Sequence, residues 1–363
     1  MRTPLPILRP LLLIAALPLT ALACLSAIGP SHKPAATAAA PAPSAEGPFV
    51  WVSNEGSGDL AVIDAARDEV VARVHVGRRP RGVRLDARAG LVFAAVSGSP
   101  RARPGLSPAF TPAADRGADG IAVVDVATRR LVRILPSGQD PESFDLVPGG
   151  KLLVVSNEET ASASIVDVET ARLVGTVTVG EEPEGVTASP DGRLVAVTSE
   201  RENRVDFIDP VAPRAVGRVS TCRRPRSVAF APDGALAFAP CEEGAAVAVI
   251  DARELLGAGE IALPAGSRPM GVAMSADGKR LFVSNGRAGT VSVIDVATRT
   301  VAATSRPFGQ RVWGIALTPD GRRLYAADGP ANDVAVLDAA TLAVLRRIPA
   351  GEAPWGVAIA RSP

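Results

Sequence analysis

The stretch LFVSNGRAGTVSVIDVATRTVAATSRPFGQRVWGIALTPDG, residues 281–321, decides the fold of this chain. Apolar residues alternate with small or polar ones in LFVSN (281–285) and TVSVIDV (290–296), and TVAATSRPFG (300–309) and VWGIALTPDG (312–321) follow. Glycine, proline and aspartate separate these segments, as they do in the turns between strands. The stretch therefore predicts four short β-strands joined by tight turns.

The same unit recurs along the chain, marked by an aspartate that follows two or three apolar residues. There are seven such aspartates, with successive separations of 61, 42, 42, 42, 44 and 43 residues. A period near 40 residues with four strands per unit is typical of the blades of a β-propeller. Seven copies of one carboxylate suit a repeated turn cap better than a single ligand site, so we interpret them as structural. The marker residues are Asp64, Asp125, Asp167, Asp209, Asp251, Asp295 and Asp338.

The two ends of the repeat region predict how the ring closes. The region starts at Phe49 with a strand that has no inner neighbour, and it ends with WGVAIA (355–360), a strand that has no outer partners. We expect this last strand to complete the blade formed by residues 49–77, because pairing removes both exposed edges. The prediction is an all-β fold in which residues 49–363 form a single seven-bladed β-propeller with four antiparallel strands in each blade.

Three segments carry a resemblance to a known family. They are FVWVSN (49–54), LLVVSN (152–157) and LFVSN (281–285), each followed by an apolar strand that ends in aspartate, and Gly-x-x-Pro-x-Gly-Val segments recur between the units. In these features the chain resembles the YVTN-repeat propellers. The resemblance implies a surface or periplasmic protein, with the haem-binding propellers of nitrite reductases and the propeller lactonases among its relatives. It implies the fold more strongly than the function.

The N-terminus predicts export. A basic start precedes an apolar run of 13 residues, Leu11–Ala23, which is too short for a helix to cross about 30 Å of hydrocarbon and is typical of a signal peptide. The run ends directly before Cys24, an arrangement that resembles a bacterial lipobox, although simple signal cleavage also fits the sequence. We expect residues 1–23 to be a signal peptide and residues 24–48, rich in Ala, Pro and Ser, to be a tether.

These features predict a protein of the cell envelope, either periplasmic or at the cell surface. With a lipid on Cys24 it would be anchored to the outer membrane, and without that lipid it would be secreted. We expect a monomer that touches the membrane only through this lipid, because no other segment of the sequence reaches 18 apolar residues.

Composition excludes several classes of function. The 39 basic and 38 acidic residues nearly cancel, so the chain lacks the basic field of nucleic-acid-binding proteins. Two histidines and three cysteines leave little material for a histidine-based metal site, a Ser-His-Asp relay or covalent haem attachment. We therefore expect no nucleic-acid partner, no metal site and no cofactor. In an oxidising compartment we expect Cys222 and Cys241 to form a disulfide rather than remain free thiols.

The loops that lead into the predicted inner strands share one face of the ring, where we expect any binding site. Around this rim the residues are charged on one half and largely aromatic on the other. Arginine binds carboxylate or phosphate and tryptophan faces bind planar groups, which suits a ligand with an anionic end and a flat apolar end. Alternatively, neighbouring blades pair their charges on a solvated surface. The candidate rim residues are Arg81, Glu142, Glu184, Arg226, Arg268, Met270, Trp313 and Trp355.

Two further features lie near this rim. Arg84 and Asp145 occupy a register at which the later blades have small residues, and they fall on adjacent blades at the same depth. They form either an inter-blade ion pair or a ligand-binding pair. An insertion of about 19 residues lies between Ser97 and Gly120 on the same face, as a flap over the channel or as a plain surface loop.

The rim offers arginine, glutamate and tryptophan but no placed general base or cofactor ligand. We therefore expect an exported, lipid-anchored scaffold that binds an envelope protein or a small ligand without catalysis. The alternative, from a different class, is a periplasmic protein that is associated with a redox cofactor or processes a lactone. In that alternative Arg84, Asp145 and Glu184 form the polar site.

Overall fold

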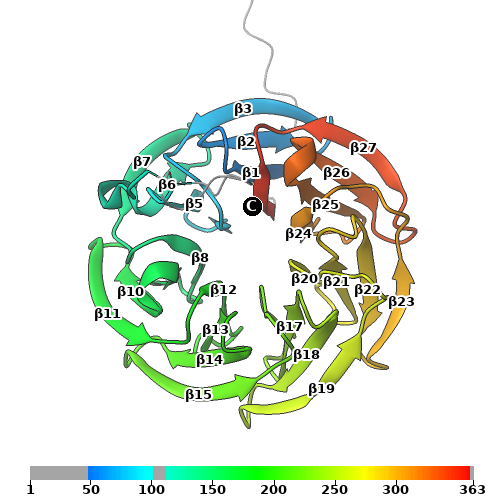
Figure 1. The fold of residues 1–363 in the computed structure, drawn as a ribbon. Coiled ribbons are helices and arrows are strands. Elements are labelled where there is room, and N and C mark those ends of the chain that lie inside the picture. The colour runs from blue at the N-terminus through cyan, green and yellow to red at the C-terminus, as the bar shows by residue number, and fades with distance from the viewer. Residues whose placement is uncertain (1–47, 101–111, 360–363) are drawn as a thin grey trace, which may run out of the picture. The chain divides into compact units, whose positions relative to one another are not determined.

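The computed structural model describes residues 48–100 and 112–359. These residues belong to one of the two units into which the chain divides, residues 45–363. They form seven sheets of four antiparallel strands each, and Figure 1 shows the sheets arranged in a ring around a central axis. The fold is a seven-bladed β-propeller, as the period of the sequence predicts. The predicted signal peptide, the lipidated Cys24 and most of the tether lie outside the described residues.

We number the blades in chain order and give each from its inner strand to its outer strand. Blade 1 consists of β28 (Pro354–Ile359), β1 (Phe49–Asn54), β2 (Asp59–Asp64) and β3 (Glu69–His75). Blades 2 to 4 consist of β4 (Val83–Asp86), β5 (Leu91–Val96), β6 (Gly120–Asp125) and β7 (Arg130–Leu135); β8 (Pro141–Leu146), β9 (Leu152–Asn157), β10 (Ser162–Asp167) and β11 (Arg172–Thr178); and β12 (Pro183–Ala188), β13 (Val195–Ser199), β14 (Arg204–Asp209) and β15 (Arg214–Ser220). Blades 5 to 7 consist of β16 (Ala229–Phe230), β17 (Leu236–Cys241), β18 (Ala246–Asp251) and β19 (Leu256–Ala262); β20 (Val272–Met274), β21 (Arg280–Ser284), β22 (Val291–Asp295) and β23 (Thr300–Thr304); and β24 (Val312–Leu317), β25 (Arg323–Asp328), β26 (Asp333–Asp338) and β27 (Val344–Pro349).

Helical structure in the described residues is confined to three single turns of 3-10 helix in loops. They are η2 (Arg116–Ala118), η3 (Glu158–Thr160) and η4 (Gly329–Ala331). No helix in the described part of the chain is long and apolar enough to cross a membrane.

Ring closure follows the prediction. Strand β28 pairs antiparallel with β1, with Trp51 opposite Ala358, so the last described strand becomes the inner strand of the first blade. Side chains reinforce the junction between blades 7 and 1. The Tyr325 hydroxyl donates a hydrogen bond of 2.9 Å to the Asp68 carboxylate, which also lies 3.1 Å from the Arg323 guanidinium. Closure therefore removes the exposed sheet edges that an open array of blades would have.

The recurrent aspartates are turn caps, as predicted. In blade 2 the Asp125 carboxylate accepts hydrogen bonds of 2.7 Å from both the amide and the hydroxyl of Thr128. The other six marker aspartates each accept at least one backbone amide two or three residues ahead. These bonds pin the turn between the third and fourth strands of every blade.

The core lies between neighbouring blades. Between blades 1 and 2, for example, Trp51, Leu60, Val92 and Val124 pack together and are fully buried. Burying one such side chain contributes about 1.5–3 kcal/mol, so each pair of sheets is held face to face mainly by apolar contact.

The Ser-Asn pairs that end several second strands also link the blades. The Ser156 hydroxyl donates to the Glu184 carbonyl at 2.7 Å, and the Ser284 hydroxyl donates to the Trp313 carbonyl at 2.6 Å. Each bond fixes the inner strand of the next blade at a residue that faces the centre of the ring.

Glycines let the inner strands converge on the axis. A Cβ atom added to Gly185 would lie 2.5 Å from the Ser227 Cα, and one added to Gly314 would lie 2.5 Å from the Trp355 carbonyl oxygen. Neighbouring backbone atoms cannot yield at such distances. A glycine at this position of the inner strand, in Pro-Glu-Gly-Val (183–186) and in Val-Trp-Gly-Ile (312–315), is thus required by close packing of the inner strands.

Candidate functional site

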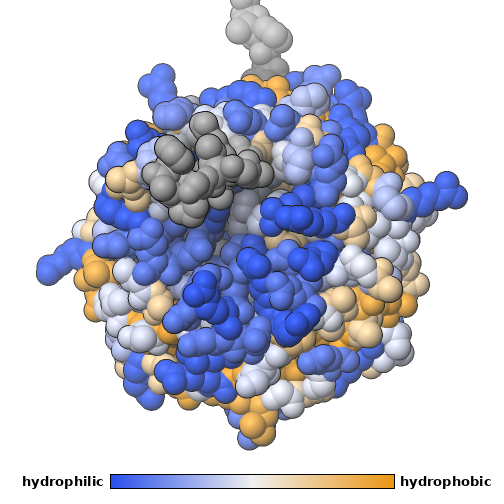
Figure 2. Space-filling model, in the orientation of Figure 1, coloured by the Kyte–Doolittle hydropathy of each residue, from blue (hydrophilic) through white to orange (hydrophobic). Residues whose placement is uncertain are grey.

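A cavity opens at the centre of the ring, on the face that carries the loops into the inner strands and the loops between second and third strands. Its volume is about 560 Å³, and its lining includes five glutamates, four arginines and two tryptophans. We call it the mouth cavity. Figure 2 shows hydrophilic side chains gathered around the centre of one face of the ring. Five predicted rim residues line the cavity: Arg81, Glu184, Arg226, Trp313 and Trp355.

A narrower channel between the inner strands adjoins the mouth cavity. Its volume is about 100 Å³, and it adds Arg84 and Met270 to four residues that it shares with the mouth cavity, Glu184, Arg226, Trp313 and Trp355. Since a water molecule occupies about 30 Å³ of liquid, the channel has room for only a few waters. A small organic ligand therefore fits the mouth cavity and not the channel.

The predicted rim charges pair between neighbouring blades. Arg81 forms an ion pair with Glu142 of the next blade, and the Arg226 guanidinium lies 3.0 Å from the Glu184 carboxylate. The setting differs from the solvated surface of our second sequence interpretation, because Glu142 is 0% exposed and Arg226 is 7% exposed. Removing one partner of a buried ion pair lowers the free energy of unfolding far more than removing one partner of a surface pair.

Three predicted rim residues, the buried Glu142 among them, lie outside the lining of the mouth cavity. Arg268 is 43% exposed, and its guanidinium lies 3.8 Å from the Glu242 carboxylate. Met270 is buried and lines the channel. The predicted rim residues therefore divide between the mouth cavity, the channel and the surrounding loops.

Sequence reasoning missed a second ring of acidic residues. In four blades a glutamate directly follows the second strand, and its carboxyl group joins the network at the mouth. The signal was present as the repeated ends VSNE (52–55), VSNE (155–158), TSE (198–200) and PCE (240–242). These glutamates are Glu55, Glu158, Glu200 and Glu242.

Arg226 is the centre of the charge network. Its guanidinium pairs with Glu184 and Glu200 and lies 3.7 Å from the Glu242 carboxylate. Arg224, from the same loop, lies 2.8 Å from Glu200 and 3.4 Å from Glu242. Three buried carboxyl groups are thus gathered around two arginines, one of them fully enclosed.

The pKa values of the buried carboxyl groups of Glu184 and Glu200 are shifted in opposite directions. Burial, then the nearby charge of Glu184, raises the pKa of Glu200 to about 9, and Glu200 donates a hydrogen bond to Glu184. Burial opposes ionisation of Glu184, but Arg226 and the hydrogen bond from Glu200 outweigh it and lower the pKa of Glu184. At neutral pH the pair therefore holds one carboxylate and one carboxylic acid side by side.

Replacing Glu200 with glutamine is expected to flatten the pH dependence of stability. Unfolded, Glu200 releases its proton near pH 4.5, and folded near pH 9. Between these pH values Glu200 is protonated in the folded state and ionised in the unfolded state. The stabilisation that Glu200 gives the folded state through its raised pKa is therefore complete below pH 4.5 and is lost as the pH rises to 9. As the pH rises, the free energy of unfolding of the wild type should fall more steeply than that of Glu200→Gln, by up to about 1.4 kcal/mol per pH unit. Urea unfolding of both proteins from pH 5 to 9 measures the slopes, and parallel curves would contradict the raised pKa of Glu200.

Two tryptophans form the apolar wall of the mouth cavity. The rings of Trp313 and Trp355 have centroids 5.3 Å apart and planes inclined by 31°. The guanidinium of Arg226 lies 5.1 Å from the centroid of the Trp313 ring, and that of Arg311 lies 4.3 Å from it. Cation–π contact holds the Trp313 ring in place. A flat apolar wall next to fixed cations is the arrangement that the sequence suggested for this half of the rim.

The expected contact between Arg84 and Asp145 is present. Their charged groups lie 3.2 Å apart, and Asp145 also accepts a 2.9 Å hydrogen bond from the Ala188 amide of the following blade. Burial raises the pKa of Asp145, and the nearby positive charge of Arg84 offsets part of this rise. This pair links blades 2, 3 and 4, and Arg84 lines the narrow channel together with Glu184.

One cluster in the described residues brings three carboxylates together. An oxygen from each of Asp140, Glu142 and Glu158 lies within 4.8 Å of the others. Arg79 lies 3.4 Å from Asp140, and Arg81 pairs with Glu142, so two of the three acids already have a cationic partner. We interpret this cluster as part of an ion-pair network between blades 2 and 3, in which Arg79 and Arg81 also pair with Glu55.

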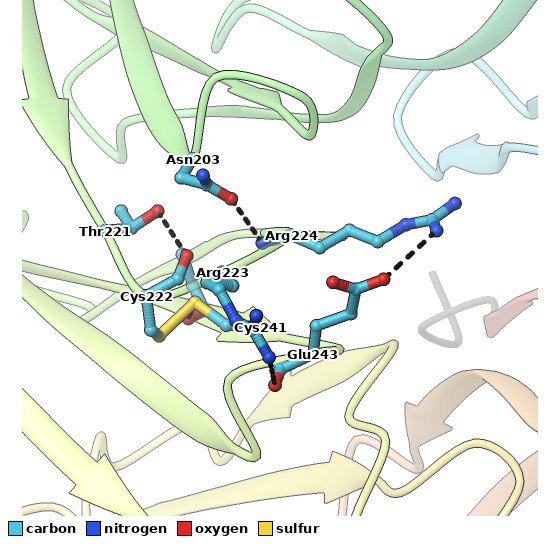
Figure 3. Close-up of a disulfide and its surroundings, with 8 residues drawn as sticks. Asn203, Thr221, Cys222, Arg223, Arg224, Cys241 and Glu243 are labelled. Carbon is cyan, nitrogen blue, oxygen red and sulfur yellow. Dashed lines mark hydrogen bonds and ion pairs between the residues drawn. A yellow bond between two sulfur atoms is a disulfide. The ribbon is translucent and has the colours of Figure 1, made fainter.

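Cys222 and Cys241 form a disulfide with a Cα–Cα distance of 5.6 Å. Figure 3 shows it beside Arg224 and Glu243, whose charged groups are joined by a dashed line and lie 3.7 Å apart. The bond ties the loop before β16 to the end of β17. It therefore braces the segment that carries both Arg224 and Arg226.

Comparison with known proteins places the fold but no family. No protein-family model matches the chain, and no curated protein matches it. Among solved structures, a putative 6-phosphogluconolactonase from Bacteroides fragilis is 16% identical with a TM-score of 0.71, over 89% of this chain and 100% of that chain. Hydrazine synthase from Kuenenia stuttgartiensis is 20% identical with a TM-score of 0.64, over 77% and 89% of the two chains. The dihydro-heme d1 dehydrogenase NirN in complex with DHE is 15% identical with a TM-score of 0.60, over 85% and 74%.

These neighbours correct one expectation from the sequence. We expected a non-catalytic binding scaffold, and that expectation is wrong, because the similar structures are an enzyme, a putative lactonase and a dehydrogenase with a bound ligand. The reason lies in the missed glutamates. Without Glu200 the rim held no acid–base pair, and the argument for a scaffold depended on that absence.

Proposed function

We propose that this protein is a hydrolase that opens a small anionic lactone in the mouth cavity. The observation that carries the proposal is the pair of Glu184 and Glu200, whose pKa values are shifted in opposite directions within one cavity. Such a pair supplies a general base and a general acid at one place. The shared fold with a putative 6-phosphogluconolactonase supports a lactone as the substrate class.

The proposed reaction needs only water as a second reactant. The Glu184 carboxylate takes a proton from a water molecule, and the oxygen of that water adds to the carbonyl carbon of the lactone. The ring C–O bond then breaks, and Glu200 gives its proton to the departing ring oxygen, which becomes a hydroxyl group. The proton on Glu184 passes to Glu200 across their hydrogen bond, which restores both groups. The product is the open hydroxy acid.

The remaining cavity residues suit binding of such a substrate. Trp313 and Trp355 offer an apolar face for the lactone ring. Arg226 lies against the acid pair, where a cation favours the negative charge that develops on the carbonyl oxygen. The buried side of this network excludes bulk water, which strengthens these interactions.

The test is hydrolysis by the purified full-length protein, followed as acid release at constant pH. We expect turnover of 6-phosphogluconolactone above its spontaneous rate, and less of uncharged gluconolactone. Glu184→Gln should lower kcat about 100-fold, because it removes the general base. Glu181→Gln is the matched control, since Glu181 is exposed and pairs with Arg201, and its kcat should stay within twofold of wild type.

Two results would refute the proposal. One is the absence of turnover with charged and uncharged lactones alike, and the other is equal kcat for wild type and Glu184→Gln. A coloured, planar cofactor that copurifies with a protein inactive on lactones would instead support the redox alternative.

We also propose that the protein is an exported lipoprotein of the YVTN-repeat family. The apolar run Leu11–Ala23 followed by Cys24 and the repeated Val-Ser-Asn strand ends support this proposal. Replacing Cys24 with serine should shift the protein from the membrane fraction to the soluble fraction of its host. Unchanged fractionation of this variant would exclude the lipid anchor.

A further inference from the structure

One of the four arginines that line the mouth cavity has no acidic partner. Arg81, Arg224 and Arg226 each form ion pairs with glutamates. Within residues 48–100 and 112–359, the guanidinium of Arg311 forms no ion pair and no hydrogen bond, and its Nε atom is buried without a hydrogen-bond partner. A half-buried cation in this state is costly, so it is poised to take an anion from outside the chain.

The backbone holds Arg311 in place. The Asp328 carboxylate accepts hydrogen bonds from the amides of Gln310 and Arg311 at 3.1 and 3.0 Å, and Asp328 is itself paired with Arg347 at 3.1 Å. The guanidinium then lies over the Trp313 ring, 4.3 Å from its centroid. The side chain is thus oriented before any ligand arrives, which lowers the entropy lost on binding.

Glu242, the acid whose charge attracts Arg311 most strongly, is already paired with other arginines. Glu242 lies within 4 Å of the guanidiniums of Arg224, Arg226 and Arg268. Burial, together with the charges of Arg226 and Arg287, lowers the pKa of Arg311 despite the attraction of Glu242. Burial is the main cause of the lowered pKa, and the two acids that attract Arg311, Glu242 and Glu184, are both within ion-pair distance of Arg226.

We propose that Arg311 is the receptor for the oxyanion of the ligand, a phosphate or carboxylate carried on a ring that packs against Trp313 and Trp355. This inference extends the proposed function by naming the anionic end of the lactone and where it binds. Binding of the anion depends only on Arg311 and the tryptophan wall, whereas hydrolysis depends on Glu184 and Glu200. The two ideas can therefore fail separately.

The experiment is titration of the full-length protein with phenyl phosphate, benzoate and benzyl alcohol, followed by tryptophan fluorescence and calorimetry. The three probes share a flat ring and differ in charge. We expect both anions to bind at least tenfold more tightly than the alcohol, and the tighter of the two identifies phosphate or carboxylate as the preferred group. Arg311→Gln should weaken the tighter anion at least tenfold and leave the alcohol unchanged.

Two further variants keep the test decisive. Arg311→Lys retains the charge without the planar fork and should bind the anion more weakly than wild type but more tightly than Arg311→Gln. Arg287→Gln is the matched control, because Arg287 is exposed and adds only long-range charge, and it should stay within twofold of wild type. Because the Arg311 guanidinium forms no ion pair or hydrogen bond within the described residues and gives up only its contact with the Trp313 ring, the glutamine variant should unfold close to the wild-type temperature.

Equal anion affinity for wild type and Arg311→Gln would overturn the inference, and so would equal affinity for the anions and the alcohol. Loss of anion binding in Arg311→Gln by a protein that hydrolyses no lactone would support the receptor and refute the hydrolase. Lactone hydrolysis that is unaffected by Arg311→Gln would do the reverse.

Discussion

Replacing Arg226 with methionine is expected to lower the free energy of unfolding by about 3–5 kcal/mol at pH 7. The change removes the cation from between Glu184, Glu200 and Glu242, all of them buried. Arg224 compensates only in part, because it is 40% exposed and does not pair with Glu184. Urea unfolding measures the loss, and the variant should recover stability as pH falls to 5, where the unpaired carboxylates take up protons.

The matched control for this prediction is Arg201→Met. Arg201 also pairs with two glutamates, Glu181 and Glu182, but it is 65% exposed. Surface pairs of this kind contribute about 0–1 kcal/mol, so the control should be nearly as stable as wild type. Equal losses in the two variants would show that burial of the Arg226 network does not set its energy.

Removing the disulfide with Cys222→Ala and Cys241→Ala is expected to cost about 3 kcal/mol. The bond closes a segment with a sequence separation of 19, and opening it gives the unfolded chain more conformations. The measurement is the midpoint of urea unfolding under oxidising conditions. Wild-type protein in reducing agent should move to the same midpoint. A double variant with the wild-type midpoint would contradict the prediction.

The disulfide also bears on the site. Arg224 and Arg226 lie in the loop that begins at Cys222, so the double variant should lose lactone hydrolysis at a lower urea concentration than wild type. This result would show that the disulfide stabilises the site without taking part in the reaction, because Glu184 and Glu200 are unchanged in the double variant.

The sequence was sufficient for the fold because each blade obeys the same local rules. The alternating strands, the Asp125-type caps and the glycines of the inner strands recur at a fixed period, so seven weak signals add up. Closure by the last strand followed from counting strands. The strand predicted over residues 300–309 ends at Thr304, since Pro307 has no amide hydrogen for the ladder.

The site was only half accessible to the same reasoning. Arg226 and Trp313 were found because they occupy the same position at the entry to the inner strand in their respective blades, and the residue type at this position varies from blade to blade. Arg84 and Asp145 were found because they occupy equivalent positions in the inner strands of adjacent blades. Glu200 was missed because it lies in a different loop of the same blade, directly after β13, where the pairing of Pro183 with Ser199 brings it close to Glu184. Arg311 was missed because it stands out only by the lack of an ion-pair partner for its guanidinium among the described residues, and this is visible only in the folded structure.

The pairing of β28 with β1 has a consequence for how the site comes into being during synthesis. Trp355 is made some 300 residues after Glu55, yet both line the same cavity. The mouth cavity therefore cannot assemble blade by blade, because one of its walls arrives with the strand that seals the ring. A chain cut anywhere before Pro354 would lose the Trp355 face and expose the edge of β1 in the same event. An incomplete copy of this protein would thus lack one wall of the mouth cavity and present an unpaired strand edge, which favours aggregation.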